Sequence, residues 1–289
     1  MKFILGIIIV CACVVGGYLG SHGKLEALWQ PFELVIIGGG AFGAFIIANP
    51  MRVVMQVFKG TFGLVVPSKF NKKMYMDLLT LMYLLFAKAR KEGLMSLESD
   101  IEEPHLSDVF KAYPSIRQNH HVMDFITDYL RLMVGGNMNA FELENLMDIE
   151  LETHHHEAEQ PSSAVQVVAD GLPAFGIVAA VMGVVITMGY ISEPPEVLGA
   201  HVGAALVGTF LGVLLAYGFA SPIANALKTK AEDESKFLQC AKVCIMATLN
   251  GYTPQIAVEF GRKAITSDKR PGFLELEEHV KAEGKKTKS

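Results

Sequence analysis

Ionisable side chains are nearly missing from one long part of this sequence. Between Pro173 and Pro222 there is no Lys, Arg, Asp or Glu except Glu193 and Glu196, which lie in a short acidic loop. The apolar runs on either side of that loop cover residues 172–191 and 198–221. Each is about as long as the ~20 residues that a helix needs to cross a bilayer. The absence of charge therefore predicts a transmembrane hairpin.

The sequence also lacks the patterns of an enzyme, a metal site or a disulfide-bonded domain. It has no nucleophile motif or phosphate-binding loop, and the triplet Gly38–Gly40 lies inside an apolar run with no strand before it. The four Cys match neither a zinc site nor a disulfide framework. The adjacent histidines His154–His156 would point in different directions on a helix. We expect no enzymatic activity, no cofactor and no bound metal, and the mild net charge of −5 makes nucleic acid an unexpected partner.

Apolar residues are abundant, but they do not fill the chain. They make up 51% of the 289 residues, whereas 19% are charged, so we expect a membrane part and a sizeable polar part. Two more apolar runs, residues 3–19 and 32–48, precede the hairpin. The first could be a cleaved signal peptide, but three remaining spans would put the basic segments on opposite sides of the membrane.

Four spans give a consistent distribution of charge. Every Lys and Arg except Lys2 and Lys24 then lies on one side of the membrane. The positive-inside rule makes that side the cytoplasm. We therefore predict four spans with both termini in the cytoplasm.

The predicted fold class is an all-α membrane protein with four transmembrane helices and a large helical cytoplasmic domain. Two spans are expected in residues 1–50 and two in residues 171–222. Residues 51–170 would form the cytoplasmic domain, and residues 223–289 a cytoplasmic helical extension with a tail. A membrane-surface helix is expected over residues 50–66, with Arg52 and Lys59 facing lipid phosphates.

Periodicity and capping residues predict the elements of the cytoplasmic parts. Helices are expected over residues 69–92 and 117–134, with a turn segment over residues 93–104. A third helix begins at the cap Asn139 and ends before Pro161. The fourth span continues to Leu249, Thr253 begins another helix, and a short helix over residues 273–282 precedes a disordered basic tail.

A basic helix end is followed at once by an acidic segment. The charged residues concerned are Lys88, Arg90, Lys91, Glu98, Asp100, Glu102 and Glu103. A solvated surface, with positive charge placed favourably at a helix C-terminus, explains this pattern without any function. The residues alone favour that explanation.

Small residues recur at four-residue spacing in three of the four runs. They are Gly39/Gly43, Gly176/Ala180 and Gly208/Gly212/Ala216. Such spacing lets helix backbones approach closely. Packing within one chain would explain it, but the repetition favours an oligomer.

No carboxylate is expected in the middle of a span. Glu33 and Asp170 fall at span ends, where water or lipid headgroups would solvate them. An ion carrier normally needs an acid inside the bilayer. If this chain takes part in ion transport, a partner must supply that acid.

Several stretches together resemble the MotA family of flagellar stator subunits. They are QPFELVIIGGGAFGAFI from Gln30, KKMYMDLLTLMY from Lys72, LPAFGIVAAVMGVV from Leu172, LVGTFLGVLLAYGFASPIA from Leu206, LNGYTPQIAVEFGRK from Leu249 and RPGFLELEEHV from Arg270. The resemblance covers essentially the whole chain. It implies a ring of five such subunits around two MotB-like subunits in the bacterial inner membrane, where the single span of the MotB-like partner carries the ion-accepting Asp. Ion flow would rotate the ring, and its cytoplasmic domain would push on the switch-complex protein of the rotor.

The resemblance also implies roles for charges and prolines. The two charges that contact the rotor in the family fall on Arg90 and Glu98. The two prolines that couple ion passage to movement fall on Pro173 and Pro222. Because proline lacks a backbone donor, it permits a helix to bend.

The transported ion is inferred from two further positions. Thr209 fits the ring of threonines that faces the channel in the family. Sodium-type relatives carry a second Thr seven residues after the first proline, and here that position is Ala180. Because Ala lacks a hydroxyl that could help to strip a hydrated Na⁺, the resemblance favours H⁺.

Three other functions stay open. The chain could be an energiser of outer-membrane processes similar to ExbB or TolQ, which typically have three spans and an outside N-terminus. It could be a sodium-driven stator. It could also be a static membrane scaffold without ion flow.

Overall fold

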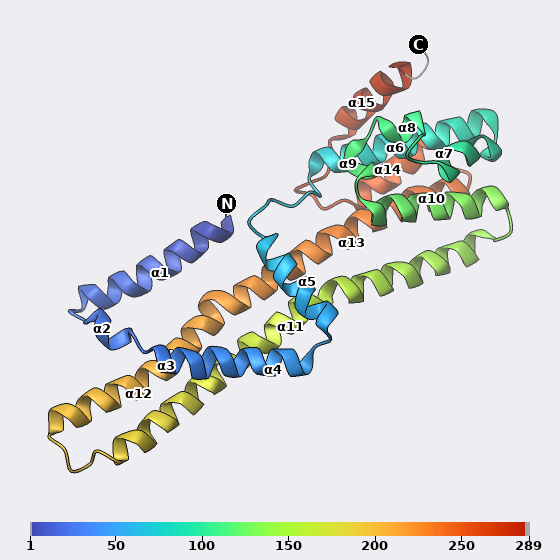
Figure 1. Cartoon of the computed structure of the whole chain (residues 1–289). Helices are drawn as coiled ribbons and strands as arrows, with labels where there is room; N and C mark the ends of the chain where they lie inside the picture. Colours follow the sequence, from blue (N-terminus) through green and yellow to red (C-terminus); the bar gives the residue numbers. More distant parts are fainter. Residues whose placement is uncertain (1, 287–289) are drawn as a thin grey trace. The chain divides into compact units, whose positions relative to one another are not determined.

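The computed structural model describes residues 2–286, and every regular element among them is helical (Figure 1). This confirms the predicted all-α fold class. The first elements are α1 (Lys2–Gly20), α2 (Leu25–Leu28), α3 (Pro31–Leu34), η1 (Val35–Gly39), α4 (Gly40–Ala48), α5 (Met51–Phe62), α6 (Lys72–Glu92), η2 (Leu94–Leu97) and α7 (Glu98–Glu102). The others are α8 (Asp108–Lys111), α9 (Pro114–Arg117), α10 (His120–Gly135), α11 (Ala140–Met188), α12 (Pro195–Leu215), η3 (Ala216–Ala220), α13 (Ser221–Leu249), α14 (Pro254–Ala264) and α15 (Phe273–Lys286).

Four helical runs among the described residues are long and apolar enough to cross a membrane. They are Lys2–Gly20, Leu25–Ala48, Ala140–Met188 and Pro195–Leu249. Three of them contain a whole apolar run found in the sequence, and Ala140–Met188 contains residues 172–188 of the run 172–191, which therefore ends three residues earlier as a helix than predicted. The number of crossings and the side on which the termini lie stay predictions.

The chain divides into two compact units. Unit 1 holds the residues up to Pro67 together with Ala158–Lys230, and unit 2 holds Ser68–Glu157 together with the residues from Ala231 onward. Helices α11 and α13 each contribute residues to both units. The four-part division at residues 50, 170 and 222 follows expected membrane boundaries instead of packing, and it stays a prediction.

Helix α11 is longer than the sequence predicts. The expected end before Pro161 is wrong, because the helix runs from Ala140 through Pro161 and Pro173 to Met188. The cost of an interior proline is offset by packing here: the Ser162 hydroxyl donates a 2.8 Å hydrogen bond to the carbonyl of Ala224 in α13, and apolar side chains on both sides of this contact are buried.

The start of α11 is as predicted. Asn139 Oδ1 accepts a 3.0 Å hydrogen bond from the N–H of Glu142, and the Glu142 carboxylate accepts a 2.9 Å bond from the N–H of Asn139. This reciprocal pair is a capping box, which satisfies two backbone donors at the helix start.

Two π-helical segments in unit 1 were not predicted. Segment η1 joins α3 to α4, and η3 joins α12 to α13. In a π turn each N–H bonds one residue further back than in an α-helix. Segment η3 ends just before Ser221 and Pro222, so the irregular ladder lies where proline removes a regular hydrogen bond.

Helix α6 is the centre of unit 2. The residues expected to share its apolar face are all buried: Tyr75, Leu78, Leu79, Met82, Leu85, Phe86 and Ala89. The helix ends at Gly93, whose φ of +90° is strained for other residues. Helix α14 packs on this core, and a Cβ on Gly261 would collide with the Sγ atom of Cys244.

Other predicted boundaries also need correction. The turn segment over residues 93–104 contains two helical turns, η2 and α7. Helix α10 begins at His120 instead of residue 117, because Asn119 caps it by accepting a 3.4 Å bond from the N–H of Val122. Helix α15 continues to Lys286, so part of the tail that was expected to be disordered is helical; residues 287–289 lie outside the described residues.

Candidate functional site

Glycines bring α11 and α12 into close contact in unit 1. A Cβ on Gly176 would lie 2.9 Å from the carbonyl oxygen of Gly208 and 3.1 Å from Gly212 Cα. A Cβ on Gly212 would lie 2.8 Å from the carbonyl oxygen of Leu172. The small residues of the hairpin therefore permit backbone-to-backbone packing, as their spacing predicted.

These hairpin glycines make their close contacts within one chain. The alternative of intramolecular packing thus accounts for Gly176, Gly208 and Gly212 without an oligomer. A Cβ on Gly39 or Gly43 would meet no atom within 4 Å. Of the glycines in the repeated spacing, only these two are left without a contact inside the described chain.

Two predicted channel residues lie beside one close contact between α11 and α12. A Cβ on Gly208 would lie 3.2 Å from Ala179 Cβ and 3.3 Å from the backbone nitrogen of Ala180. Thr209 follows Gly208 directly, so Ala180 and Thr209 lie at the same level of the α11–α12 contact.

The two predicted coupling prolines lie apart from each other. Pro173 follows Leu172, whose carbonyl faces Gly212. Pro222 lies in the first turn of α13, near the bond between Ser162 and Ala224. The roles of both prolines in ion passage stay predictions.

Glu33 is less solvated than the sequence predicted. The residue is partly buried, and its Oε2 atom is fully buried and has no hydrogen-bond partner among the described residues. That atom would lie 3.0 Å from a Cβ on Gly208. Gly208 follows Pro195, the first residue of α12, by 13 positions, which is about 20 Å along a helix. Glu33, at the start of the apolar run 32–48, thus lies beside the interior of the run 198–221.

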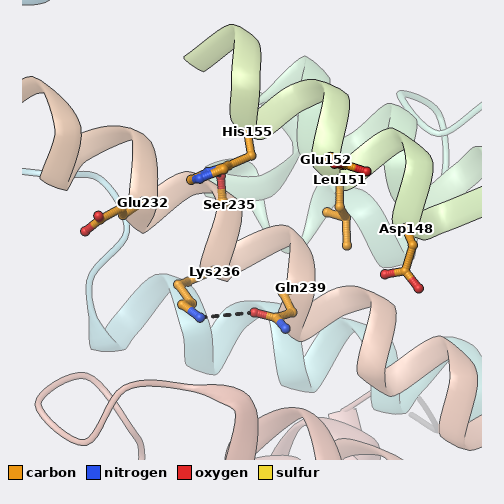
Figure 2. A pocket seen from close by; sticks show the side chains of 8 residues that line it. All are labelled: Asp148, Leu151, Glu152, His155, Glu232, Ser235, Lys236 and Gln239. Carbon is orange, nitrogen blue, oxygen red and sulfur yellow. Dashed lines mark hydrogen bonds between the residues drawn. The ribbon is translucent and has the colours of Figure 1, made fainter. Parts of the chain in front are cut away.

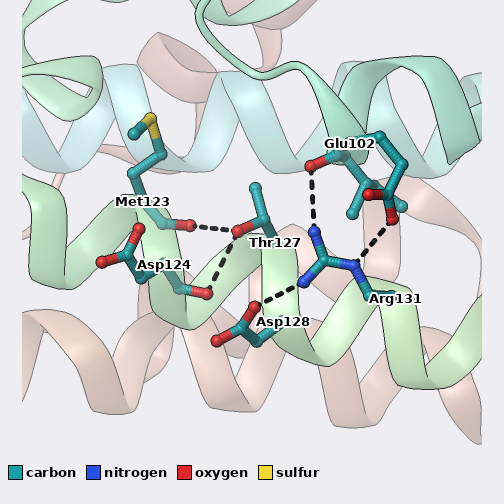
Figure 3. A network of polar contacts seen from close by, with 7 residues as sticks. Glu102, Met123, Asp124, Thr127, Asp128 and Arg131 are labelled. Carbon is teal, nitrogen blue, oxygen red and sulfur yellow. Dashed lines mark hydrogen bonds and ion pairs between the residues drawn. The ribbon is translucent and has the colours of Figure 1, made fainter.

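Several charges of the basic-to-acidic segment in unit 2 are held by partners. Lys88 Nζ lies 2.7 Å from Asp100 Oδ2, and the Ser107 hydroxyl donates a 2.6 Å bond to Asp100 Oδ1. Asp100 is only 6% exposed, so this pair fixes α7 against α6. Arg131 in α10 binds Glu102 at 2.8 Å and Asp128 at 2.7 Å (Figure 3). These contacts explain Lys88, Asp100 and Glu102 through packing within unit 2.

Arg90 and Glu98 differ from their neighbours. Both are exposed, and neither side chain makes a hydrogen bond or ion pair with the residues that the structure describes. Arg90 lies in the last turn of α6, and Glu98 begins α7. Arg90 also lines a shallow pocket, whose other lining residues are Tyr83, Ala87, Lys91, Pro254 and Gln255. Both charges are therefore available to a partner molecule.

The three adjacent histidines point to different partners, as predicted. His154 Nε2 lies 3.8 Å from Glu234 Oε1, and His155 Nδ1 lies 3.1 Å from the Ser235 hydroxyl. His156 Nε2 lies 3.8 Å from Glu152 Oε1 on the same helix.

The histidine surroundings give no metal site. Within residues 2–286, no group of His, Cys, Asp or Glu could hold a metal ion. His155 lines a shallow pocket that also carries Asp148, Glu152, Glu232 and Lys236 (Figure 2). Burial lowers the pKa of His154, and the nearby Glu234 carboxylate opposes this shift.

Two family models match the sequence. The model described as Motility protein A N-terminal matches residues 4–93, and that of the MotA/TolQ/ExbB proton channel family matches residues 117–239. Neither model describes a family of enzymes.

A curated relative extends the match to nearly the whole chain. Motility protein A of Escherichia coli K12 is 53% identical over 282 residues, which cover 98% of this chain and 96% of the relative. Two solved structures share the fold. The C. jejuni MotAB structure has a TM-score of 0.76 at 18% identity and covers 92% of this chain and 96% of its own. The flagellar MotAB stator complex from Bacillus subtilis has a TM-score of 0.72 at 24% identity and covers 89% and 92%. The chain belongs to the motility protein A family.

Proposed function

We propose that this chain is the stator subunit of a bacterial flagellar motor and forms a proton channel with a MotB-like partner. The observation that carries this proposal is the 53% identity to Motility protein A of E. coli over nearly the whole length of both chains. The matched N-terminal model is specific to motility protein A. This favours the stator over an energiser similar to ExbB or TolQ.

The partner supplies the acid that accepts the ion. Between Pro173 and Met188 in α11, and from Val197 to Pro222 in α12, η3 and the start of α13, this chain has no Asp or Glu. The hairpin helices themselves therefore offer no carboxylate to a proton that crosses beside them. The single span of the MotB-like partner supplies a carboxylate there.

Several copies of the chain surround the partner in the inner membrane. Five subunits around two partners is the arrangement that the family implies. Large apolar side chains of α1, such as Ile8 and Ile9, are exposed in the single chain. Lipid or a neighbouring subunit would cover them. Both termini lie in the cytoplasm, in agreement with the distribution of Lys and Arg.

Movement begins at the hairpin and passes along two helices. Pro173 lies beside the contact with Gly212, and Pro222 follows the π segment η3. Both positions lack a regular backbone hydrogen bond and can bend at low cost. Because α11 and α13 both continue beyond unit 1, a bend there moves residues of unit 2 as well.

The rotor contact is made by Arg90 and Glu98. Both charges are exposed, and neither has a partner among the described residues. In contrast, Lys88 pairs with Asp100, and Glu102 pairs with Arg131. A charge without an intramolecular partner can pair with a rotor protein at no structural cost to its own chain.

A deletion strain tests the proposed function. Cells without this gene should assemble flagella but not swim, and only joint expression of the chain and its MotB-like partner should restore swimming. Expression of either chain alone should leave the cells paralysed. Normal swimming in the deletion strain would refute the stator proposal. A defect in outer-membrane import would instead favour an energiser similar to ExbB or TolQ.

A further inference from the structure

The carboxyl group of Glu33 reaches a point where three helices meet. Glu33 belongs to α3, and its buried Oε2 atom faces Gly208 of α12. A Cβ on Gly208 would lie 3.0 Å from this oxygen, and also 3.2 Å from Ala179 Cβ and 3.3 Å from the nitrogen of Ala180 in α11. The missing side chain of Gly208 therefore provides the space that the carboxyl group fills.

The other atoms nearest to this point carry no charge: besides Glu33 Oε2, the atoms closest to a Cβ on Gly208 belong to Ala179 and Ala180. The titratable side chains that α11, α12 and η3 carry within unit 1 lie elsewhere along these elements: Glu159, Asp170, Glu196, His201 and Tyr217. In α2, the charged side chain is that of Glu26, which is exposed. Within residues 2–286, Glu33 thus forms no salt bridge, and its Oε2 atom accepts no hydrogen bond that would stabilise its charge.

A partly buried carboxyl group with an unpartnered buried oxygen lowers stability, so its presence calls for a functional explanation. An ionised carboxylate removed from water without a partner costs far more free energy than a neutral one. Ionisable groups inside a membrane are accordingly rare, and they usually mark ion or proton pathways. Thr209, which fits the channel-facing threonine ring, follows Gly208 directly.

We propose that Glu33 is a proton-binding site that this chain itself contributes to the channel region. The proposal rests on the proposed function and adds a carboxyl group to the one that the partner supplies. The carboxylate takes up one proton from water, becomes neutral and later releases the same proton; only the O–H bond forms and breaks.

Proton uptake at Glu33 changes the charge beside the α11–α12 contact. When Glu33 is ionised, its negative charge attracts a cation toward the level of Ala180 and Thr209. When Glu33 is protonated, that attraction is gone. The site thereby links the occupancy of the channel to the place where the hairpin is most tightly packed.

Infrared difference spectroscopy tests this site directly. The purified complex of the chain with its MotB-like partner, in lipid, is compared between acidic and alkaline buffer. In the parent, the C=O stretching bands of protonated carboxyl groups should include one that E33Q removes. E33D should retain this band at a shifted frequency. E26Q, which changes an exposed carboxylate on α2, is the matched control and should leave it in place. An E33Q spectrum identical to that of the parent overturns the proposal.

Swimming gives a second readout that separates this proposal from the proposed function. In the deletion strain, E33Q should lower swimming speed and E26Q should not. If the parent chain restores swimming and E33Q matches the parent in both speed and spectrum, Glu33 is not a proton site and the stator proposal stands. If the parent chain fails to restore swimming, the stator proposal fails, and the spectrum still decides whether Glu33 binds a proton.

Discussion

At the scale of single residues, the structure separates charges that hold the fold from charges that are free. The sequence places eight charged residues within residues 88–103 but gives no way to rank them. Lys88 and Asp100 are joined at 2.7 Å, and Glu102 is held by Arg131, which lies nearly thirty residues away in α10. Such pairs depend on how the helices pack, so no local pattern could have identified them. What remains exposed and unpaired includes both residues that the family resemblance singled out, Arg90 and Glu98.

Charge reversal at Arg90 should abolish motility without affecting stability. R90E changes an exposed charge with no partner among the described residues, so the unfolding free energy of the chain should stay within about 0.5 kcal/mol of the parent. K88E is the matched control. It places a second carboxylate beside the buried Asp100 and should cost about 2 kcal/mol, less than a fully buried pair because Lys88 is partly exposed.

The two variants should also differ in their response to the rotor. An opposite charge change in the rotor protein should partly restore swimming of R90E cells and should do nothing for K88E cells. Thermal unfolding and swimming speed are the two measurements. Normal swimming of R90E cells would leave Arg90 as an ordinary surface charge.

At the scale of elements, local signals predicted most helices and failed where distant contacts decide. The apolar face of α6 and the caps Asn139 and Thr253 follow from neighbouring residues, and the structure has them as expected. The end of a helix before Pro161 was wrong because packing against α13 outweighs the local penalty of the proline. The burial of Glu33 was missed for a similar reason, since it depends on how far α3 lies along α12.

A motif that is characteristic of a family can also stabilise the fold without contacting a partner. The stretch from Asn250 to Lys263 carries much of the family resemblance, yet its Arg262 is buried and bound at 2.6 Å to both oxygens of Glu259. Its third contact is a 3.0 Å bond to the carbonyl of Pro271. Arg262 thereby fixes the turn before α15, and burial leaves it unavailable to a partner.

The packing of α11 on α12 can be tested by adding one methyl group. G212A would place a Cβ 2.8 Å from the Leu172 carbonyl oxygen and 2.9 Å from Gly176 Cα, so backbone must move. We expect a loss of about 1–3 kcal/mol in unfolding free energy and a loss of swimming. G39A is the control, because its Cβ would meet no atom within 4 Å. It should be neutral or stabilising by up to about 1 kcal/mol in the isolated chain. Equal unfolding midpoints for the two variants, measured by circular dichroism in detergent, would refute the close packing of the hairpin.

At the scale of the whole molecule, the ion that drives the motor should be H⁺. One charge that crosses ~100 mV releases about 2.3 kcal/mol, so torque requires many ions and swimming speed reports which ion supplies the energy. Ala180 carries a methyl group at the level of Thr209. The helices are tightly packed there, because the backbone nitrogen of Ala180 would lie 3.3 Å from a Cβ on Gly208. Without a second hydroxyl there, the hairpin offers little to replace the water around a Na⁺ ion.

In cells that carry this chain and its partner as the sole stator, an uncoupler should stop swimming, whereas replacing external Na⁺ by K⁺ at constant ionic strength should not change the swimming speed. A steep dependence on Na⁺ would show instead that Thr209 and the acid of the partner suffice to bind sodium, and that the methyl group of Ala180 does not select the ion.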